Sequence, residues 1–322
     1  MRHVFITGGT GFFGKSMLDL RFRRADFRND EWTILSRDPD GFRARFPRLA
    51  GQPGVSFVNG DVRDFAAAGR FDDIIHAATA AVTTLPDEEM TSTIVDGTRH
   101  VIDFARRCGA ERLLFTSSGA VYGPQTAPVD EMAACSPATA YGRGKLEAER
   151  MLAASGLDVK IARCFAFTGP FLSRDIHYAI GNFIGDCLAG RDIVIRGDGT
   201  PCRSYLYADD LVEWLFAVLE RGQTARPYNV GSARSVSIRE LAETVRATLG
   251  GAREVRVLAE AKPGPAPVYV PVVSRACAEL GVREAFGLEE AILRSAGRLP
   301  RPDASMSRFW RFRICRMIHD GF

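Results

Sequence analysis

Tyr141 and Lys145 are the residues of this chain whose types and spacing first suggest chemistry. They lie four positions apart in "AYGRGKLEAE", so a helix would carry both side chains on one face, one turn apart. A phenol ordinarily titrates at about 10, and a neighbouring ammonium group favours its phenolate form, which moves the pKa toward neutral pH. Tyr141 could then exchange a proton with a substrate hydroxyl or carbonyl group. The same spacing also occurs by chance on solvated helix faces, so its meaning depends on its surroundings.

A glycine-rich stretch near the start of the chain supplies those surroundings. Gly8, Gly11 and Gly14 in "ITGGTGFFGK" follow an apolar run and open a segment with helical spacing. Glycines at this point let the backbone approach a pyrophosphate, whose charge meets the N–H groups at the helix start. A flexible turn is the competing interpretation of the glycines alone. The context of strand and helix favours a dinucleotide-binding loop.

The residues after the second apolar run bear on which dinucleotide would bind. In "LSRDPDG" this position holds an acid in proteins that read the NAD ribose and a base in proteins that read the extra phosphate of NADP. Ser36 and Arg37 favour NADP(H), whereas Asp38 next to them leaves NAD(H) open. A solvated arginine is the alternative interpretation of Arg37.

Alternating strands and helices would position these residues. Short β-branched or apolar runs indicate buried strands, and segments with a spacing of three to four residues between them indicate helices. We expect strands at 3–7, 32–36, 55–58, 73–77, 112–117 and 159–165, and helices at 14–24, 91–108 and 141–155, the last ending at Gly156. This alternation predicts an α/β fold, a Rossmann-type doubly wound parallel sheet.

The second half of the chain is richer in Gly and Pro and has only isolated helical segments, at 209–221 and 237–249. We therefore expect a dinucleotide-binding domain over 1–165 with a return near 226–232, and a smaller C-terminal substrate-binding lobe over 166–300. Residues 301–322 form a tail in which arginines alternate with aromatic and aliphatic residues. Its apolar residues make no clean helical stripe, so packing on the protein itself or on a dimer mate is favoured over a membrane role.

Composition excludes several classes of function. The chain has 322 residues, a formal net charge of +3 and scattered Lys and Arg residues, which argues against nucleic acid as a partner. Its seven cysteines lie far apart without metal-ligand spacing, which indicates reduced thiols, no metal site and a cytoplasmic protein. No apolar run approaches the roughly 18 residues of a membrane span.

Together, "TGGTGFFG", "HAAT", "TSSGAVYG" and "YGRGK" resemble the extended short-chain dehydrogenase/reductase family of nucleotide-sugar epimerases and dehydratases. The resemblance covers about residues 3 to 295. It implies that Ser118 hydrogen-bonds the reacting oxygen, that Tyr141 is the acid or base, and that Lys145 holds the nicotinamide ribose. The cofactor-binding residues expected on this basis are Gly8, Gly11, Phe12, Phe13, Gly14, Ser36, Arg37, Asp61, Val62, Ala77, Ala78, Tyr141 and Lys145.

A later motif points to the substrate. "IRGDGTPCRSYLYADDL" is similar to a family signature in which the arginine at the place of Arg203 meets a nucleotide diphosphate. The planar donors of an arginine suit two phosphate oxygens, so Ser118 and Arg203 are the expected substrate-binding residues and a nucleotide-diphosphate sugar is the expected partner. Asp209 and Asp210 open a helix, and we expect them to be N-cap residues. The family also implies a homodimer formed through the helices at 91–108 and 141–155.

The chain departs from the family pattern at three places. Ile94 and Ala166 stand where many relatives have asparagine, which puts the proton relay and the placement of the substrate in doubt. Gly119-Ala120 stands where 4,6-dehydratases have Asp-Glu, and elimination needs such an acid and base. Unless Asp130 or Glu131 supplies a carboxylate from another loop, dehydration is disfavoured.

Hydride transfer at one carbinol or ketone remains. The expected activity is that of an NAD(P)-dependent nucleotide-sugar oxidoreductase acting at sugar C4. A 4-keto-sugar reductase is favoured by Arg37, and a 4-epimerase with retained cofactor is the alternative. A 4,6-dehydratase is less favoured, because this chain lacks the Asp-Glu pair of those enzymes. A non-catalytic NADP sensor is also less favoured, because this chain keeps both Tyr141 and Lys145.

Overall fold

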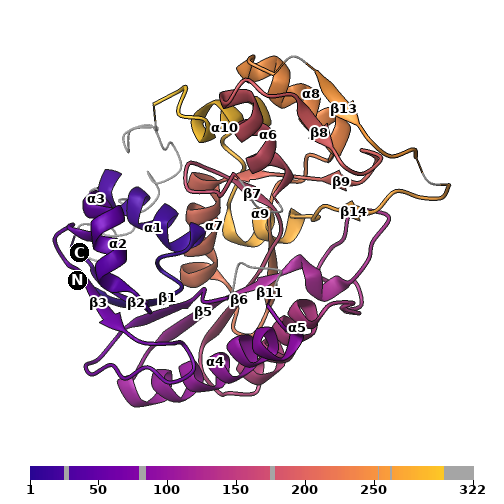
Figure 1. Cartoon of the computed structure of the whole chain (residues 1–322). Coiled ribbons are helices and arrows are strands. Elements are labelled where there is room, and N and C mark those ends of the chain that lie inside the picture. The colour runs from indigo at the N-terminus through magenta and orange to yellow at the C-terminus, as the bar shows by residue number, and fades with distance from the viewer. Residues whose placement is uncertain (25–28, 80–84, 175–177, 253, 262, 301–322) are drawn as a thin grey trace, which may run out of the picture.

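Seven parallel strands form one central sheet in the computed structural model, which describes residues 1–24, 29–79, 85–174, 178–252, 254–261 and 263–300 (Figure 1). The order across the sheet is β11-β6-β5-β4-β1-β2-β3. The strands are β1 (His3–Thr7), β2 (Glu31–Ser36), β3 (Val55–Asn59), β4 (Asp73–His76), β5 (Arg112–Ser118), β6 (Val159–Cys164) and β11 (Pro227–Val230). The predicted fold class is confirmed, and each strand expected from the sequence is present with ends shifted by one residue at most.

Helices cover both faces of this sheet, because successive side chains of a buried strand point to opposite faces. Val4 and Ile6 of β1 belong to one hydrophobic core, whereas Phe5 between them belongs to the other. The first core packs on α1 (Phe12–Arg23), α7 (Ala208–Arg221) and α9 (Ser274–Leu280), and the second on α4 (Asp87–Cys108) and α5 (Ala140–Ala153). Figure 1 shows α4 and α5 below the sheet and α1 and α7 above it. Two short helices, α2 (Pro39–Arg45) and α3 (Pro47–Ala50), lie between β2 and β3.

The chain reverses its direction across the sheet between β1 and β4, which are neighbours in it. In open α/β sheets such a switch point opens a crevice at the carboxyl ends of the strands, where ligands bind. Thr7 and His76, the last residues of the two strands, pair in register. The glycine-rich loop and the "HAAT" segment therefore start side by side at the expected ligand edge.

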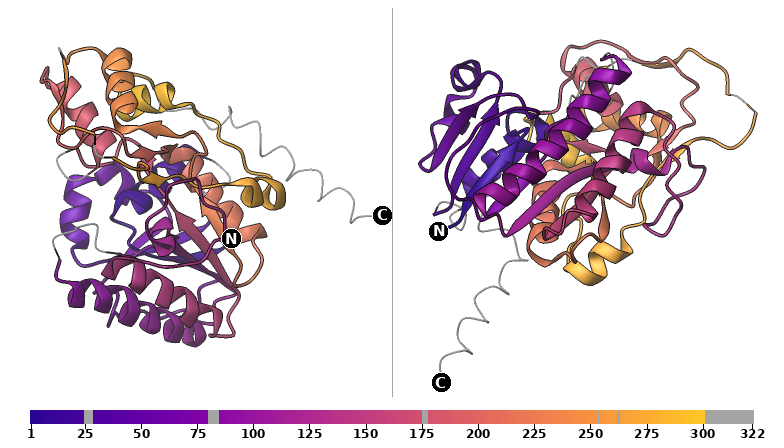
Figure 2. Two further views of the ribbon diagram at one scale, coloured as in Figure 1. Left: turned by 90° about the vertical axis from the view of Figure 1, so that its right-hand side faces the viewer. Right: turned by 90° about the horizontal axis from the view of Figure 1, so that it is seen from below.

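A second hydrophobic unit, built largely from residues after β6, forms the C-terminal lobe. It contains the helices α6 (Ala179–Leu188), α8 (Ile238–Leu249) and α10 (Leu288–Ser295), which are grouped at the top of the molecule in Figure 1 and in the left view of Figure 2. Its short strands are β7 (Phe167–Thr168), β8 (Ile193–Ile195), β9 (Cys202–Arg203), β10 (Leu206–Tyr207), β12 (Val236–Ser237), β13 (Val255–Val257) and β14 (Val268–Tyr269). Ser237 caps α8 through a reciprocal pair of hydrogen bonds with Glu240, as its sequence suits.

Two segments tie the lobe to the sheet. Strand β11 pairs with β6 at the sheet edge after the chain has passed through α6 and α7. The stretch 268–272 pairs with β9 of the lobe through β14, and its backbone also bonds to Gln125 and Val129 of the loop after β5. The lobe therefore lies against the carboxyl ends of β5 and β6.

Two helix ends differ from the sequence expectation. Helix α5 stops at Ala153 with Ala154 as its C-cap, and Gly156 takes the left-handed conformation two residues later. Asp209 and Asp210 are not N-caps, since Tyr207 occupies that position. Instead, Asp209 pairs with Arg23 and Asp210 accepts the backbone N–H groups of the loop at 285–286, because both side chains are drawn into buried contacts.

Within the described ranges no helix is long and apolar enough to cross a membrane. The predicted packing of the basic and aromatic tail, on the protein itself or on a dimer mate, concerns residues 301–322, which lie outside the described residues.

Candidate active site

Ser118, Tyr141 and Lys145 come together at the carboxyl end of β5. Ser118 is the last residue of β5, and Tyr141 and Lys145 lie in the first two turns of α5, which packs against that strand. Thr139 accepts a hydrogen bond from the Gly142 N–H and so fixes the start of α5. The three residues that were predicted to be catalytic therefore share one site, which we call the catalytic row after that prediction.

Lys145 is buried and held from two sides. Its Nζ donates to the carbonyl oxygen of Thr116 and to Thr79 Oγ1, each at 2.7 Å, and it lies over the rings of Phe115 and Tyr141. Burial lowers the pKa of Lys145 to about 7, while Cys164 and Glu149 act in the opposite direction. The ammonium group is thus fixed in place and loses its proton more easily than an exposed lysine does.

Tyr141 lies beside Ser118. Burial raises the pKa of Tyr141 above its usual value, and the nearby Ser118 hydroxyl opposes that rise. Ser118 Oγ also accepts the N–H of Ala120 at 3.1 Å, which orients its remaining lone pair and its proton into the site. In this arrangement burial keeps Tyr141 protonated, and the fall in its pKa that the spacing with Lys145 predicted is not found.

Tyr269 is a site residue that the sequence did not reveal. Its Oη lies 3.3 Å from Ser118 Oγ and 3.5 Å from the carbonyl oxygen of Cys164, and burial raises the pKa of this phenol to about 12. It comes from β14 of the lobe, in the stretch "PAPVYVPVV", which reads as a proline-rich loop. Its pairing with Arg203 in register carries it to the row, and nothing in the sequence pattern marks that pairing.

The glycine-rich loop has the close approach that its sequence suggested. Gly8 has φ of 73°, and a Cβ there would lie 2.5 Å from the carbonyl carbon and oxygen of Ala77 and 2.7 Å from Ala78 N. At Gly14 a Cβ would lie 2.2 Å from the Gly9 backbone. Only glycine fits at either place. The glycine-rich loop therefore packs backbone to backbone against the "HAAT" segment, with no room for a side chain at Gly8.

His76 fixes the two sides of this crevice together. Its Nδ1 lies 2.8 Å from Thr7 Oγ1, which accepts the Ala78 N–H, and its Nε2 lies 3.1 Å from Thr98 Oγ1. Thr98 donates its own proton to the Ile94 carbonyl, so His76 donates from Nε2 and accepts at Nδ1. Burial lowers the pKa of His76 to about 3. This ring is a neutral structural link and no proton donor to a ligand.

The two charged residues after β2 have different environments, since Asp38 is held in a turn and Arg37 is exposed. Asp38 Oδ1 accepts the Gly41 N–H as the N-cap of α2, and Asp38 N–H donates to Ser36 Oγ. Arg37 is exposed beside this turn, near enough to Asp61 to help lower the pKa of that carboxyl. Asp61 itself is paired with Arg63, Nε to Oδ1 at 2.7 Å.

Other predicted residues fall around the same edge. Val62 is buried, and Phe12 and Phe13 begin α1, with Phe13 against Phe167 of β7. Arg203 is half-buried in β9, where its Nη1 donates to the neighbouring Cys202 carbonyl and its guanidinium lies 5.4 Å from the Tyr269 ring centroid. Arg203 is thus joined to the catalytic row through Tyr269.

The departures from the family pattern have structural counterparts. Ile94 is buried in the core of α4 and α5, where it faces Gly144, and Ala166 packs in the lobe core. Gly119 lies against Phe165, so that a Cβ there would be 2.7 Å from a ring carbon. Neither candidate carboxylate reaches the row. Glu131 accepts a hydrogen bond from the Asn229 N–H and lies 3.7 Å from Arg275. Asp130 is exposed, and its Oδ1 accepts a hydrogen bond from the Met132 N–H.

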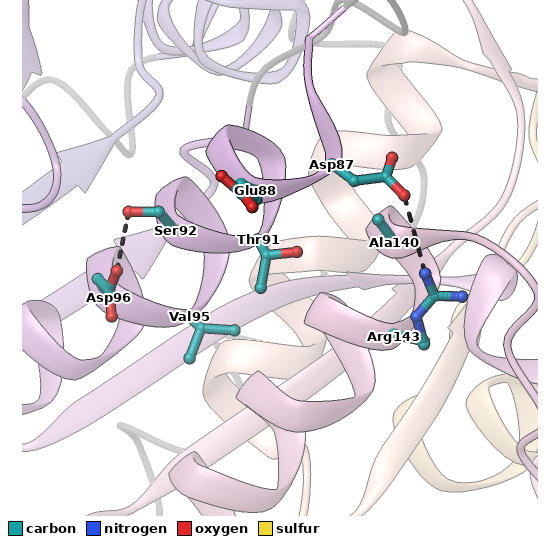
Figure 3. Close-up of a pocket in the computed structure, with 8 residues that line it drawn as sticks. All are labelled: Asp87, Glu88, Thr91, Ser92, Val95, Asp96, Ala140 and Arg143. Carbon is teal, nitrogen blue, oxygen red and sulfur yellow. Dashed lines mark hydrogen bonds and ion pairs between the residues drawn. The ribbon is translucent and has the colours of Figure 1, made fainter.

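One pocket of about 400 Å³ lies elsewhere, on the outer side of α4 and the start of α5 (Figure 3). Asp87, Glu88 and Asp96 line it together with Arg143, whose guanidinium lies 3.9 Å from Asp87. Its side chains come from the helix surface and not from the carboxyl ends of the strands. It is therefore separate from the catalytic row.

Comparison with known proteins establishes the family. The model of the NAD dependent epimerase/dehydratase family matches residues 4–231. The chain belongs to this family. The member described here is thus an extended short-chain dehydrogenase/reductase with the fold and the enzyme class that its sequence predicted.

Curated relatives carry named sugar-nucleotide activities. UDP-glucuronic acid decarboxylase 6 of Arabidopsis thaliana is 28% identical over 302 residues, which cover 90% of this chain and 86% of that protein. UDP-glucuronic acid decarboxylase 1 of Xenopus tropicalis is 29% identical over 310 residues, with 90% and 70% covered. This chain is therefore a family member related to nucleotide-sugar-modifying enzymes.

Solved structures agree with this fold over nearly the whole chain. DesIV of Streptomyces venezuelae, a dTDP-glucose 4,6-dehydratase with NAD and TYD bound, has a TM-score of 0.80 at 27% identity, covering 92% of this chain and 96% of that one. UDP-glucose 4-epimerase of Thermotoga maritima with UDP-glucose has a TM-score of 0.80 at 20% identity, covering 92% and 98%. The second match shows a shared fold alone.

Proposed function

We propose that this enzyme transfers hydride at C4 of a nucleotide-activated hexose without eliminating water, and that its net reaction is reduction of a 4-keto sugar. The observation that carries the proposal is the absence of a carboxylate beside Ser118 among the described residues. Gly119 and Ala120 have no titratable side chain, and both Asp130 and Glu131 are engaged elsewhere. A site of this kind can move a proton at one oxygen but lacks the acid and base that elimination requires.

Three residues would act on the reacting oxygen. When bound, the nicotinamide ring supplies the hydride. Tyr141 would donate the proton to the oxygen at C4, and Ser118, already oriented by the Ala120 N–H, would hydrogen-bond that oxygen. Lys145, one turn from Tyr141, would stabilise the resulting phenolate and bind the ribose of the cofactor. The second hydroxyl near Ser118, that of Tyr269, would contact the sugar.

NADP(H) is the cofactor that we propose. Asp38, the acid that kept NAD(H) open, is engaged as the N-cap of α2. Arg37 is exposed, so its guanidinium is free to pair with a 2′-phosphate. Two solved neighbours have NAD bound, so a cofactor comparison is part of the test.

The nucleotide part of the substrate would bind through the lobe. Arg203 is half-buried at the border of the lobe and the catalytic row, where the oxygens of a diphosphate could accept hydrogen bonds from its guanidinium. We further infer that a homodimer forms through α4 and α5, whose outer surfaces lie together on one side of the sheet (Figure 1).

A second candidate is favoured by the curated relatives, which are named UDP-glucuronic acid decarboxylases. Oxidation at C4 would turn a glucuronate into a β-keto acid, which loses carbon dioxide without an Asp-Glu pair. A 4-epimerase would need the same row and the same retained cofactor. Of the three net reactions, only the reduction consumes the cofactor.

The test is the nicotinamide absorbance after mixing the enzyme and NADPH with a panel of nucleotide sugars. Stoichiometric oxidation with a 4-keto-6-deoxy nucleotide sugar would support the reductase. Turnover of UDP-glucuronate or of a saturated nucleotide hexose in the presence of NAD⁺ or NADP⁺, without net reduction of that cofactor, would overturn it in favour of the decarboxylase or the epimerase.

The control is Tyr141→Phe, which removes the proton donor alone. We expect turnover to fall by about 10² to 10⁴-fold while NADPH binding is retained. If no member of the panel reacts with either protein, a cofactor-sensing protein replaces the enzyme as the best proposal.

A further inference from the structure

A buried ion pair lies directly beneath the catalytic row. Glu149 follows Tyr141 and Lys145 at the same four-residue spacing on α5, so the three side chains occupy one face of the helix. Arg163 of β6 binds the Glu149 carboxylate with two donors, Nε to Oε1 at 3.0 Å and Nη2 to Oε2 at 2.7 Å. Both side chains are 7% exposed. A bidentate pair at this depth has the fixed geometry of a strong ionic contact.

A serine completes the cluster. Ser117 Oγ donates to Glu149 Oε1 at 2.5 Å. Ser117 is paired in register with Arg163 across β5 and β6, and the next pair along the two strands is Ser118 with Cys164. One carboxylate therefore joins the strand that ends in Ser118 to the helix that carries Tyr141 and Lys145.

The charges around Lys145 give this contact a chemical meaning. The titratable groups that face it are Tyr141 and Glu149 on its own helix, Cys164 on β6 and His76 on β4. Burial raises the pKa of the Cys164 thiol to about 12 and lowers that of His76 to about 3, so both are neutral at working pH. Glu149, which forms a salt bridge with Arg163, is the carboxylate among them.

The surroundings of Glu149 are polar but carry little opposing charge beyond its partner. Arg163 faces it from β6 and Ser117 from β5, and the Cys135 thiol, whose pKa is raised by burial, lies close to both members of the pair. The Arg163 guanidinium also lies 4.9 Å from the Tyr122 ring centroid. Glu149 acts to raise the pKa of Lys145.

We propose that Glu149 is a positioning residue for the hydride-transfer reaction, which holds Ser118 and Lys145 in one geometry through Ser117 and Arg163 and places a negative charge one helical turn from the Lys145 ammonium. This inference rests on the proposed function for its chemistry. It gives Glu149 a role that ordinary core ion pairs lack, because the loss of its charge should change how Lys145 titrates.

The test compares Glu149→Gln with Asp73→Asn. Asp73 pairs with Arg112 across β4 and β5 with the same two-donor geometry, 2.7 and 3.0 Å, but at the opposite end of the strands. Each variant replaces a buried carboxylate by an amide of the same shape. A merely structural role would make the two variants behave alike.

The first readout needs no sugar substrate. The Lys145 ammonium repels the positive charge of an oxidised nicotinamide, so the ratio of the Kd values for NADP⁺ and NADPH should change as pH passes the pKa of Lys145. Fluorescence titrations across pH 5 to 9 would locate the inflection, which we expect at about 7, the pKa of Lys145. In Glu149→Gln we expect the inflection to move about one pH unit lower, and in Asp73→Asn not to move. An unchanged inflection in Glu149→Gln would overturn the proposal.

The second readout uses whichever panel substrate reacts. Because Glu149 does not touch the substrate, Glu149→Gln should lower kcat above neutral pH by about tenfold with KM unchanged. If Glu149→Gln fails to fold, Ser117→Ala removes only the hydrogen bond, and it should lower kcat with KM unchanged. Wild-type kcat in Ser117→Ala would overturn the positioning role. If no substrate reacts, the proposed function fails while the cofactor titration still decides the role of Glu149.

Discussion

Arg37 is the single residue that decides our choice of cofactor. It is exposed at the end of β2, whereas its neighbour Asp38 is engaged in capping α2. We expect Arg37→Ala to weaken NADPH binding by about one to two orders of magnitude, since a charge-assisted pair with phosphate is lost at roughly 1.5–3 kcal/mol. NADH binding should stay within about twofold of the wild type. Equal losses for both cofactors would show that Arg37 does not read the phosphate.

Gly119 supports the proposed absence of elimination chemistry, because it has no carboxylate, and its surroundings also leave little room for a side chain. A Cβ at this position would lie 2.7 to 2.9 Å from three atoms of the buried Phe165 ring. Gly119→Ala should therefore cost about 1–3 kcal/mol of unfolding free energy in urea denaturation. The control is Gly197→Ala, whose Cβ would meet nothing within 4 Å, and it should change stability by less than about 0.5 kcal/mol.

The clash with Phe165 also predicts how the loss can be relieved. A smaller side chain at 165 leaves room for the new methyl group, so the costs of Gly119→Ala and Phe165→Leu should not add. Additive costs in the double variant would mean that some other contact destabilises Gly119→Ala.

At the scale of the elements, His76 joins β1, β4 and α4. The pKa of His76 is lowered from the ordinary histidine value of 6.5 to about 3 in the folded protein. Below pH 6.5 the unfolded chain therefore binds a proton at His76 that the folded protein does not bind. The contribution of His76 to the free energy of unfolding is fully present above pH 6.5 and falls as the pH decreases toward 3. The slope is up to about 1.4 kcal/mol for each pH unit.

His76→Gln removes this proton-linked loss. The variant should be less stable than the wild type at pH 7, because it disturbs the hydrogen bonds to Thr7 and Thr98, but the difference should shrink as the pH falls from 6.5 to 4. Unfolding free energies from urea titrations at several pH values would measure it. A difference that is constant with pH would mean that His76 titrates normally in the folded protein.

Much of this arrangement could be predicted from the sequence, because its signals are local. Gly8 and Gly14 predict the tight loop, and the spacing of Tyr141 and Lys145 predicts that both lie on one helix face. The contacts that could not be predicted are those between distant segments. Tyr269 reaches Ser118 through a proline-rich strand, and Asp210 turns to a loop of residues 285–286 instead of capping its helix. Glu149 repeats the spacing of Lys145, so the sequence held a signal for it, although the role of Arg163 depends on strand register.

At the scale of the whole molecule, the sheet is completed by a strand that follows much of the lobe. A fragment of residues 1–165 ends with β6 and lacks both β11 and α7, which contribute Tyr228, Val230 and a row of buried α7 side chains to the first core. We expect this fragment to be insoluble or to lack fixed tertiary packing, whereas residues 1–300 should fold. Near-UV circular dichroism and solubility after expression would distinguish them. A soluble, cooperatively unfolding fragment 1–165 would show that the nucleotide-binding part is an independent unit.

The late position of β11 also matters while the chain is being made. As the ribosome releases the protein from its N-terminus, β6 emerges with its outer edge unpaired, and it stays unpaired until residues 165–226 have followed. An exposed strand edge is a template for pairing with other chains. Newly made chains should therefore depend most on chaperones in that interval, and pausing of translation between β6 and β11 should lower the yield of native enzyme more than pausing after β11.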